Sequence, residues 1–280
     1  MPVQSELIYR YDGSFDGLLC CVFESYEKKE IPLDILPPDA AASLLFPAKA
    51  IPTDAQKANR VLISIPEKLG KAALHVIRHA FLTCLAQKEL YILLFFRLGY
   101  RHGPSVVNML TNNVVNTLFK AVRHLERESH LLKGFLRFSI VNQVLIAEIE
   151  PQNMVLPLLV QHFCERYPQE SFFIHDKTHG MGLVYQPYQA AIIPVEQLEL
   201  PGADEQEQTY RKLWQLFYDT IAVEGRYNPT CRMSHMPKHY WQYMTEFCRT
   251  PNTRSPLLPK TGNRCLNTPP KEIASDTSSQ

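Results

Sequence analysis

The sequence lacks both a long hydrophobic run and an excess of charge of either sign. Its longest apolar run, Leu90 to Phe96, has seven residues, whereas a transmembrane helix needs about 18 or more. The 29 Lys and Arg residues nearly balance the 28 Asp and Glu residues. This balance excludes a uniformly basic coat but leaves room for a local basic patch. With 45% hydrophobic and 20% charged residues, the composition is typical of a chain that folds.

Cysteine patterns and the usual catalytic signatures are also missing. The seven cysteines are widely spaced and include no C-x-x-C pair, which argues against a disulfide framework, a cysteine-rich zinc site or an iron–sulfur cluster. The sequence contains no Walker loop, G-x-G-x-x-G, H-E-x-x-H or G-x-S-x-G motif. Residues 1–6 do not resemble a secretory signal. We therefore expect a cytoplasmic protein, and the sequence indicates no cofactor and no metal.

The N-terminal half is predicted to be mainly helical. A short strand over Leu7–Tyr11 precedes a helix over Phe15–Lys29, with Ser14 as its N-cap. Residues 31–52 contain five prolines and are predicted to form an extended surface linker. Three more helices are expected up to Leu98, the last ending at Gly99 as its C-cap.

The segment Val106–Leu132 is predicted to form an amphipathic helix. Turning about 100° per residue puts its Val, Leu and Phe residues on one face and Lys120, Arg123, His124 and Arg127 on the other. From Arg97 to Arg137 the chain has seven Lys or Arg against two Glu, while residues 138–229 have five basic against twelve acidic residues. The basic part faces either a polyanion or the acidic part of the chain, or it is simply solvated.

The C-terminal half is predicted to be a sheet with packed helices. Two strands, Phe135–Val141 and Val144–Ile149, form a hairpin about Asn142-Gln143, and three strands follow a helix over residues 155–167. A last helix over residues 203–224 carries apolar residues on one face. The fold class is α+β with a mainly antiparallel sheet. We expect one domain over residues 1–248, with a helical part to about 133 and a sheet part from 134, and a disordered tail over 249–280.

Two groups of polar residues are candidates for chemistry. The first is Glu128, His130 and Arg137, where a cation on an apolar strand face points to an anionic partner; the alternative is a salt bridge that locks helix to sheet. The second is His175-Asp176 at a strand end, which suits a general base or a metal ligand. His162 and Glu165 are its candidate further ligands, and the alternative is an Asx-turn at Asp176.

A third group is suited to nucleic acid. The segment Lys238 to Trp241 mixes cationic and aromatic side chains, a combination that stacks on unpaired bases but that also anchors a C-terminal segment to a core. Together with the basic helix face, the candidate nucleic-acid-binding residues are Arg97, Arg101, Lys120, Arg123, Arg127, Lys238 and Trp241.

Several motifs in the same order give the sequence a family resemblance. They are residues 11–19 (YDGSFDGLL), 97–100 (RLGY), 128–130 (ESH) with 134–138 (GFLRF), 149–151 (IEP), 162–163 (HF) with Arg166, 174–176 (IHD), 183–185 (LVY) and 236–241 (MPKHYW). In these the chain resembles a bacterial family of uncharacterised proteins described as DNA metabolism or DNA repair proteins. Members are encoded beside a radical-SAM protein, and some are fused to a uracil-DNA glycosylase domain.

The resemblance implies a role in DNA processing alongside a radical-SAM partner, and it assigns no catalytic residue. Here the turn after His175-Asp176 reads Lys177-Thr178-His179-Gly180, where the family often has an Arg- or Lys-rich turn. The three clustered cysteines of a radical-SAM protein are absent, so that chemistry belongs to the partner. Three hypotheses follow: a DNA-binding protein, a subunit that docks the partner without touching DNA, and a DNA-processing enzyme in which Glu128, His130, Arg137, His175 and Asp176 share one cleft.

Overall fold

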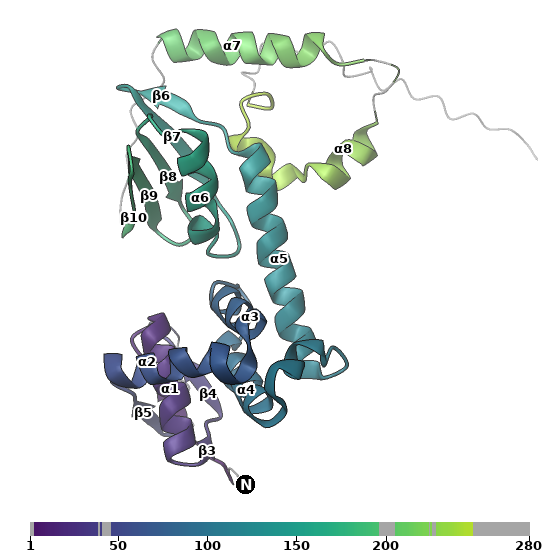
Figure 1. The fold of residues 1–280 in the computed structure, drawn as a ribbon. Helices are drawn as coiled ribbons and strands as arrows, with labels where there is room; N and C mark the ends of the chain where they lie inside the picture. Colours follow the sequence, from purple (N-terminus) through teal and green to yellow (C-terminus); the bar gives the residue numbers. More distant parts are fainter. Residues whose placement is uncertain are drawn as a thin grey trace, which may run out of the picture.

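Helices dominate the N-terminal half of the protein and a five-stranded sheet lies in the C-terminal half, which confirms the predicted α+β class. The computed structural model describes residues 3–38, 40, 46–195, 205–223, 225 and 228–248. The long helix α5 (Asn113–Phe135) joins the two halves (Figure 1). The predicted disordered tail, residues 249–280, lies outside the described residues. Among the helices described, none has the length and apolarity needed to span a membrane.

The N-terminal half contains a small parallel sheet that the sequence analysis missed. Strand β2 (Ile8–Arg10) lies between β4 (Asp34–Leu36) and β5 (Ala48–Ala50), and both run parallel to it. Nearby, β1 (Val3–Gln4) pairs with β3 (Glu30–Ile31). The expected surface linker over residues 31–52 is therefore wrong, because this stretch supplies two strands of the sheet and Ile35 is fully buried. Strands of three residues between prolines are too short to show an alternating pattern.

The first N-terminal helix starts where the sequence predicts. Helix α1 (Phe15–Glu27) begins at Ser14, whose hydroxyl accepts a hydrogen bond from the Gly17 amide, so the predicted N-cap is confirmed. Helix α2 (Ala55–Ser64) leads through a π-helical turn, η1 (Ile65–Leu69), into α3 (Lys71–Phe81). Helix α4 (Lys88–His102) is followed by the 3-10 helix η2 (Gly103–Asn108).

The predicted end of α4 at Gly99 is wrong. The helix continues to His102, and Gly103, with φ of +65°, caps it. Gly99 is buried inside the helix, where a Cβ atom would lie 2.4 Å from Cδ2 of Leu69. The close approach of Leu69, and not the backbone conformation of a helix end, therefore favours glycine at this position.

Helix α5 contributes to two separate hydrophobic cores. Its residues up to Val122 pack with α1 to α4 and the small sheet, whereas Leu125 and Leu132 pack with the five-stranded sheet. One helix therefore belongs to both halves of the molecule. The division into a helical and a sheet part at about residue 133 stays a prediction, as does the single domain over residues 1–248.

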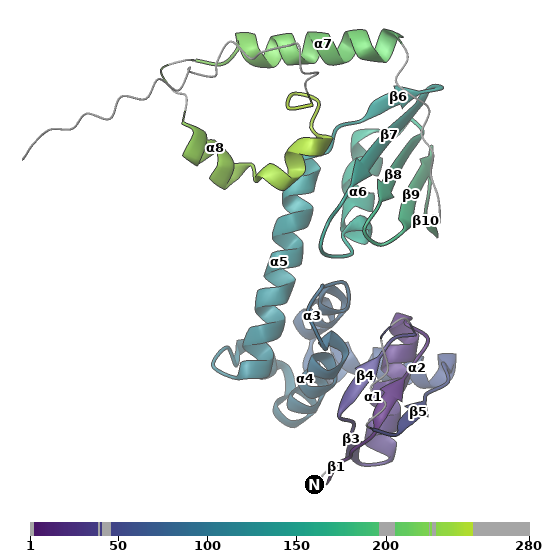
Figure 2. The same ribbon diagram turned by 180° about the vertical axis from the view of Figure 1, so that it is seen from behind.

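The large sheet has the strand order β10-β9-β8-β7-β6. Its strands are β6 (Ser139–Val141), β7 (Val144–Ile149), β8 (Phe172–Asp176), β9 (Met181–Gln186) and β10 (Gln189–Pro194). All neighbours are antiparallel except β7 and β8, which are linked by the crossover helix α6 (Leu156–Arg166). This helix covers one face of the sheet (Figures 1 and 2). Asn142 and Gln143 both have positive φ, as the predicted tight hairpin needs.

The last described segment crosses the end of the sheet. Helix α7 (Glu205–Thr220) is followed by α8 (Pro229–His235) and the 3-10 helix η4 (Lys238–Tyr243). Tyr240 and Met244 are buried against the core of the sheet half, so this segment is packed. The apolar side chains of α7, in contrast, are largely exposed.

Candidate functional site

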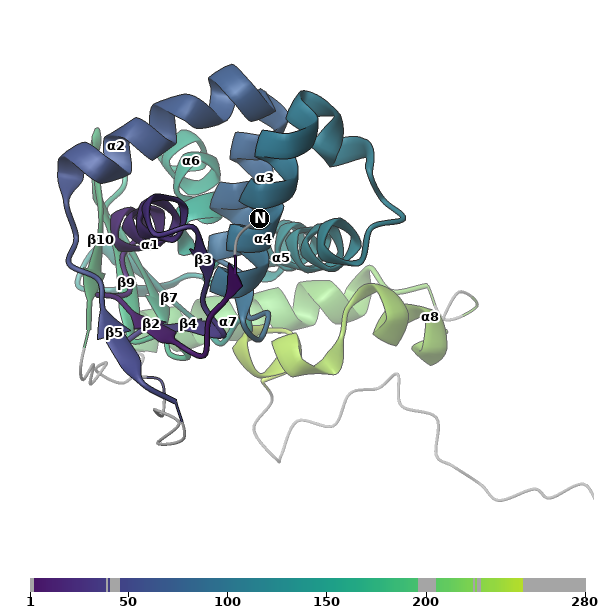
Figure 3. The ribbon, with the colours of Figure 1, turned by 90° about the horizontal axis from the view of Figure 1, so that it is seen from below.

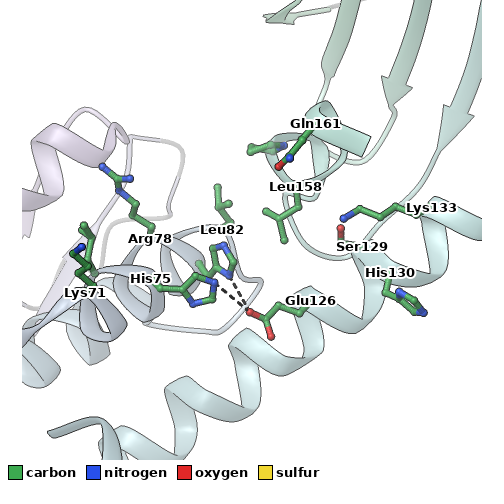
Figure 4. Close-up of a pocket in the computed structure, with 13 residues that line it drawn as sticks. Lys71, His75, Arg78, Leu82, Glu126, Ser129, His130, Lys133, Leu158 and Gln161 are labelled. Atoms are coloured by element: carbon green, nitrogen blue, oxygen red, sulfur yellow. Dashed lines mark hydrogen bonds and ion pairs between the residues drawn. The ribbon is translucent and has the colours of Figure 1, made fainter. Parts of the chain in front are cut away.

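A cleft of about 770 Å³ opens where α3, α5 and α6 meet. Figure 3, which looks along α5, shows α3 beside that helix. Polar side chains of α3 and α5 line the cleft together with Pro157, Leu158 and Gln161 of α6 (Figure 4). We call this the α3–α5–α6 cleft.

The cleft has polar walls because polar residues are spaced along one face of each of two helices. On α3, Lys71, His75 and His79 follow one another at four-residue intervals, while Val76 and Ile77 on the other side of the helix are buried. On α5, Glu126, Ser129 and Lys133 lie on one face at intervals of three and four. Residues three or four apart share a helix face, so each helix directs a polar stripe at the other.

Two histidines and one carboxylate meet across this gap (Figure 4). Nδ1 of His79 lies 3.1 Å, and Nε2 of His75 lies 3.7 Å, from the same Glu126 oxygen, Oε1. The two imidazole rings have centroids 3.9 Å apart. One ligand atom from each residue lies within 4.8 Å of the others. Burial, with the neighbouring His75 as a further cause, lowers the pKa of His79 despite Glu126, which favours the neutral imidazole that a metal ion needs.

The cleft carries more positive than negative charge. Lys71, Arg78 and Lys133 line it, against the single carboxylate of Glu126. Among the ion pairs of the described residues, none involves these three cations. A carboxylate or phosphate that binds in the cleft would therefore not have to displace an existing ion-pair partner of these cations.

A buried hydroxyl group also faces the cleft. Ser129 is 2% exposed, and its Oγ has no hydrogen-bond partner among the described residues. A buried polar group without a partner costs about 1–3 kcal/mol, so it is a place where a ligand atom or a water molecule is expected. Lys133 lies four residues further along the same face of α5.

The five predicted catalytic residues occupy different places. His130 is exposed and lines the α3–α5–α6 cleft. Arg137 lines a second cleft, of about 560 Å³, beside α6 and α7, and pairs with Glu246 at 2.8 Å. Glu128, His175 and Asp176 line neither cleft. Their convergence in one catalytic site stays a prediction.

Glu128 and Asp176 make hydrogen bonds that stabilise the local structure. The buried Glu128 carboxylate accepts hydrogen bonds from the backbone amides of Gln152 and Asn153. Asp176 accepts from the amides of Thr178 and His179, which is the Asx-turn considered above, and its Oδ2 lies 2.7 Å from Nδ1 of His179. These contacts hold a helix to a loop and close a turn.

Of the residues predicted to bind nucleic acid, two make contacts within the protein and the others are exposed. Arg97 donates hydrogen bonds to the backbone oxygens of Ser25 and Glu30 and so connects α4 with α1 and β3. Trp241 donates to the Met236 oxygen and stacks on Phe247, so it anchors the C-terminal segment. The remaining predicted residues are exposed: Arg101, Lys120, Arg123, Arg127 and Lys238.

The sequence analysis missed His75 and His79. Their four-residue spacing inside a helical pattern was a usable signal, since it puts both rings on one face. Glu126 was not among the predicted site residues. The structure directs it to α3, 47 residues away in sequence from His79.

Comparison with known proteins gives one family match. The model of a domain of unknown function (DUF4130) matches residues 86–246, more than half of the chain. The matched stretch contains α5, α6 and the large sheet. Helix α3, with His75 and His79, precedes it. No curated protein matches the chain.

Proposed function

Because the chain belongs to the family of the domain of unknown function DUF4130, we propose a function from its own residues: it binds DNA, with the sugar–phosphate backbone held at the α3–α5–α6 cleft. The observation that carries this proposal is the set of cations in the cleft, Lys71, Arg78 and Lys133, which lack ion-pair partners among the described residues. Phosphate contacts from Lys and Arg supply most of the affinity of proteins that bind DNA without regard to sequence.

The exposed basic face of α5 extends this surface. His130 lines the cleft, and Arg127 and Arg123 precede it by three and seven residues on the same exposed side of the helix. Side chains at these intervals are neighbours on a helix surface. A DNA strand lying in the cleft would therefore pass from Lys133 over His130 to the two arginines.

The proposed biological setting comes from the family resemblance. On this basis we propose that the protein works in DNA repair or DNA metabolism with a radical-SAM protein, and in some cases with a uracil-DNA glycosylase. In this setting the chain presents DNA to a partner that carries out the chemistry.

Fluorescence anisotropy with labelled single-stranded and duplex DNA, titrated against salt, tests the proposal. We expect binding that weakens steeply with salt, with a log–log slope of about −0.7 to −0.9 per phosphate contact. The double variant Arg78→Glu/Lys133→Glu should weaken binding. It should also make the slope shallower by the amount expected for the loss of roughly two phosphate contacts. Arg123→Glu/Arg127→Glu tests the helix face in the same way.

A matched control reverses the same amount of charge elsewhere. Arg60→Glu/Lys68→Glu alters two exposed cations of the N-terminal helices that lie outside the cleft. If this control loses as much affinity as the cleft variant, binding depends on net charge alone and the proposed cleft is wrong. Absence of DNA binding at low salt would overturn the function itself.

A second candidate function is favoured by the surface of α7. This helix and the residues after it expose large apolar side chains, a property that marks protein interaction sites: Tyr210, Leu213, Leu216, Phe217, Ile221 and Val223 are each more than half exposed. On this alternative the chain docks the radical-SAM partner through α7 without touching DNA. Co-purification that survives nuclease treatment and is lost in Leu216→Asp/Phe217→Asp would support it, whereas co-purification unchanged by that variant would exclude α7.

A further inference from the structure

We propose that His75, His79 and Glu126 bind one divalent transition-metal ion at the edge of the α3–α5–α6 cleft, and that Zn²⁺ fits these ligands. The inference needs no DNA and does not depend on the proposed function. It begins from three side chains of the types that hold zinc in enzymes, two imidazoles and one carboxylate. They come from two helices that pack against each other, so their backbones are fixed.

The distances between the ligand atoms fit a single ion. Zinc bonds of about 2.0–2.2 Å in tetrahedral geometry put neighbouring ligand atoms roughly 3.3 Å apart. The Glu126 oxygen lies 3.1 Å from Nδ1 of His79 and 3.7 Å from Nε2 of His75. Small side-chain rotations are enough to place all three atoms around one ion, since all lie within 4.8 Å of one another.

The contacts without a metal are weak in comparison. An exposed His–Glu pair contributes little to stability, and the His75 side chain is 56% exposed with that of Glu126 at 44%. The two imidazole rings have centroids 3.9 Å apart, so both lie close enough to bind the same ion. A divalent ion between the two helices would replace these weak contacts with three ligand bonds.

Three protein ligands leave at least one coordination position for another molecule. Structural zinc sites usually have four protein ligands, whereas sites with three keep a position for water or substrate. His75 and Glu126 are exposed and line the cleft, so the open coordination position faces the cleft (Figure 4). The cations Lys71, Arg78 and Lys133 and the unpartnered Ser129 hydroxyl line the same cleft. The class of ligand that suits the open position is therefore an anionic oxygen, such as that of a phosphate ester.

Direct metal binding tests the inference. The full-length protein is treated with a chelator, dialysed and titrated with Co²⁺, whose visible absorption reports the ligands, and then with Zn²⁺ in competition. We expect one site with nitrogen and oxygen ligands. His79→Ala and Glu126→Gln should each weaken Zn²⁺ binding by roughly 100-fold or more, since changes beyond the ligand shell already cost about 10–100-fold. His75→Ala, at an exposed position, repeats the test with little risk to folding.

The control variant removes a competing pair of metal ligands. Sγ of Cys231 lies 3.7 Å from Nδ1 of the exposed His235, and a thiolate ligand adds near-ultraviolet charge-transfer absorption to bound Co²⁺. Cys231→Ala/His235→Ala should leave the affinity unchanged. The proposal is overturned if the wild-type protein binds no metal, if His75→Ala and His79→Ala keep its affinity, or if the control loses it. Each of these results leaves DNA binding, measured with chelator present, to be judged separately.

Discussion

Glu128 of α5 and Asn153 of the loop before α6 form a doubly hydrogen-bonded pair. Oε2 of Glu128 accepts from the Asn153 backbone amide at 2.9 Å and from its side-chain amide at 2.6 Å. Oδ1 of Asn153 in turn accepts from the amide of Cys84, in the segment that follows α3. The pair therefore ties together α3, α5 and α6, the three elements that enclose the cleft. This contact explains the buried carboxylate without assigning it a chemical role.

We predict that Glu128→Gln destabilises the protein by about 1–3 kcal/mol, because an amide nitrogen then faces backbone donors that need an acceptor. Chemical denaturation, followed by circular dichroism, measures this loss. Glu126→Gln on the same helix is the control, since its carboxylate is 44% exposed and should cost less than about 0.5 kcal/mol. Equal stability of wild type and Glu128→Gln would contradict the structural role.

Gly99 gives a second prediction about packing. Alanine has the higher helix propensity and by that measure alone would stabilise α4 by roughly 1 kcal/mol. The added Cβ atom, however, would lie 2.4 Å from Cδ2 and 2.6 Å from Cγ of the buried Leu69. We expect Gly99→Ala to destabilise the protein by about 1–3 kcal/mol through overpacking. Leu69→Ala should remove that clash, so the double variant is expected to lose less than the sum of the two single losses; strict additivity would show that the two sites do not touch.

The same glycine shows what the sequence predicts and what it does not. A Gly near the end of an apolar run indicates a helix end, and the contact with Leu69, 30 residues earlier, is invisible in that pattern. Ser14 and the Asn142-Gln143 turn were predicted well because their effect is local. The strand before that turn was predicted to begin at Phe135, which is wrong, because Phe135 still belongs to α5 and β6 begins at Ser139. Strands β4 and β5 were missed because three residues between prolines show no period, and their pairing with β2 depends on contacts across the chain.

In the candidate site, too, the local pattern can be read from the sequence and the tertiary contact cannot. The spacing of His75 and His79 is a local pattern that a search for i, i+4 histidines finds. The meeting of that pair with Glu126 depends on how α3 packs against α5, which the sequence of neither helix reveals. Glu128 and Asp176 were predicted as catalytic residues, and the structure shows that they accept hydrogen bonds from Gln152 and Asn153 and from the turn after β8.

Asp12 yields a prediction for the dependence of stability on pH. Its carboxylate accepts hydrogen bonds from the Ser14 hydroxyl and amide and from the Thr53 hydroxyl, and the bond from the Ser14 hydroxyl is the main cause of its lowered pKa. A carboxyl with a lowered folded-state pKa stabilises the protein above its unfolded pKa, and this stability is lost as the pH falls through the folded-state value. Wild type should therefore be more stable than Asp12→Asn at pH 7, with the difference shrinking below about pH 4. The measurement is a series of denaturation curves across that range, and a difference that stays constant with pH would refute the assignment.

Metal and DNA should bind cooperatively if both occupy the α3–α5–α6 cleft. A divalent ion at His75, His79 and Glu126 adds positive charge beside Lys71, Arg78 and Lys133 and offers a coordination position to a phosphate oxygen. We expect Zn²⁺ to raise the affinity for single-stranded DNA by roughly 5–150-fold, the usual range of coupling between two sites, and DNA to raise the affinity for Zn²⁺ by the same factor. Anisotropy with and without chelator measures the first effect, and metal titration with and without DNA measures the second. The Cys231→Ala/His235→Ala variant should keep the coupling and His75→Ala/His79→Ala should lose it, because only the latter removes the ion from the path of the phosphates. A metal effect that persists in the histidine variant would place the ion elsewhere, for example as a bridge between DNA and the exposed cysteines.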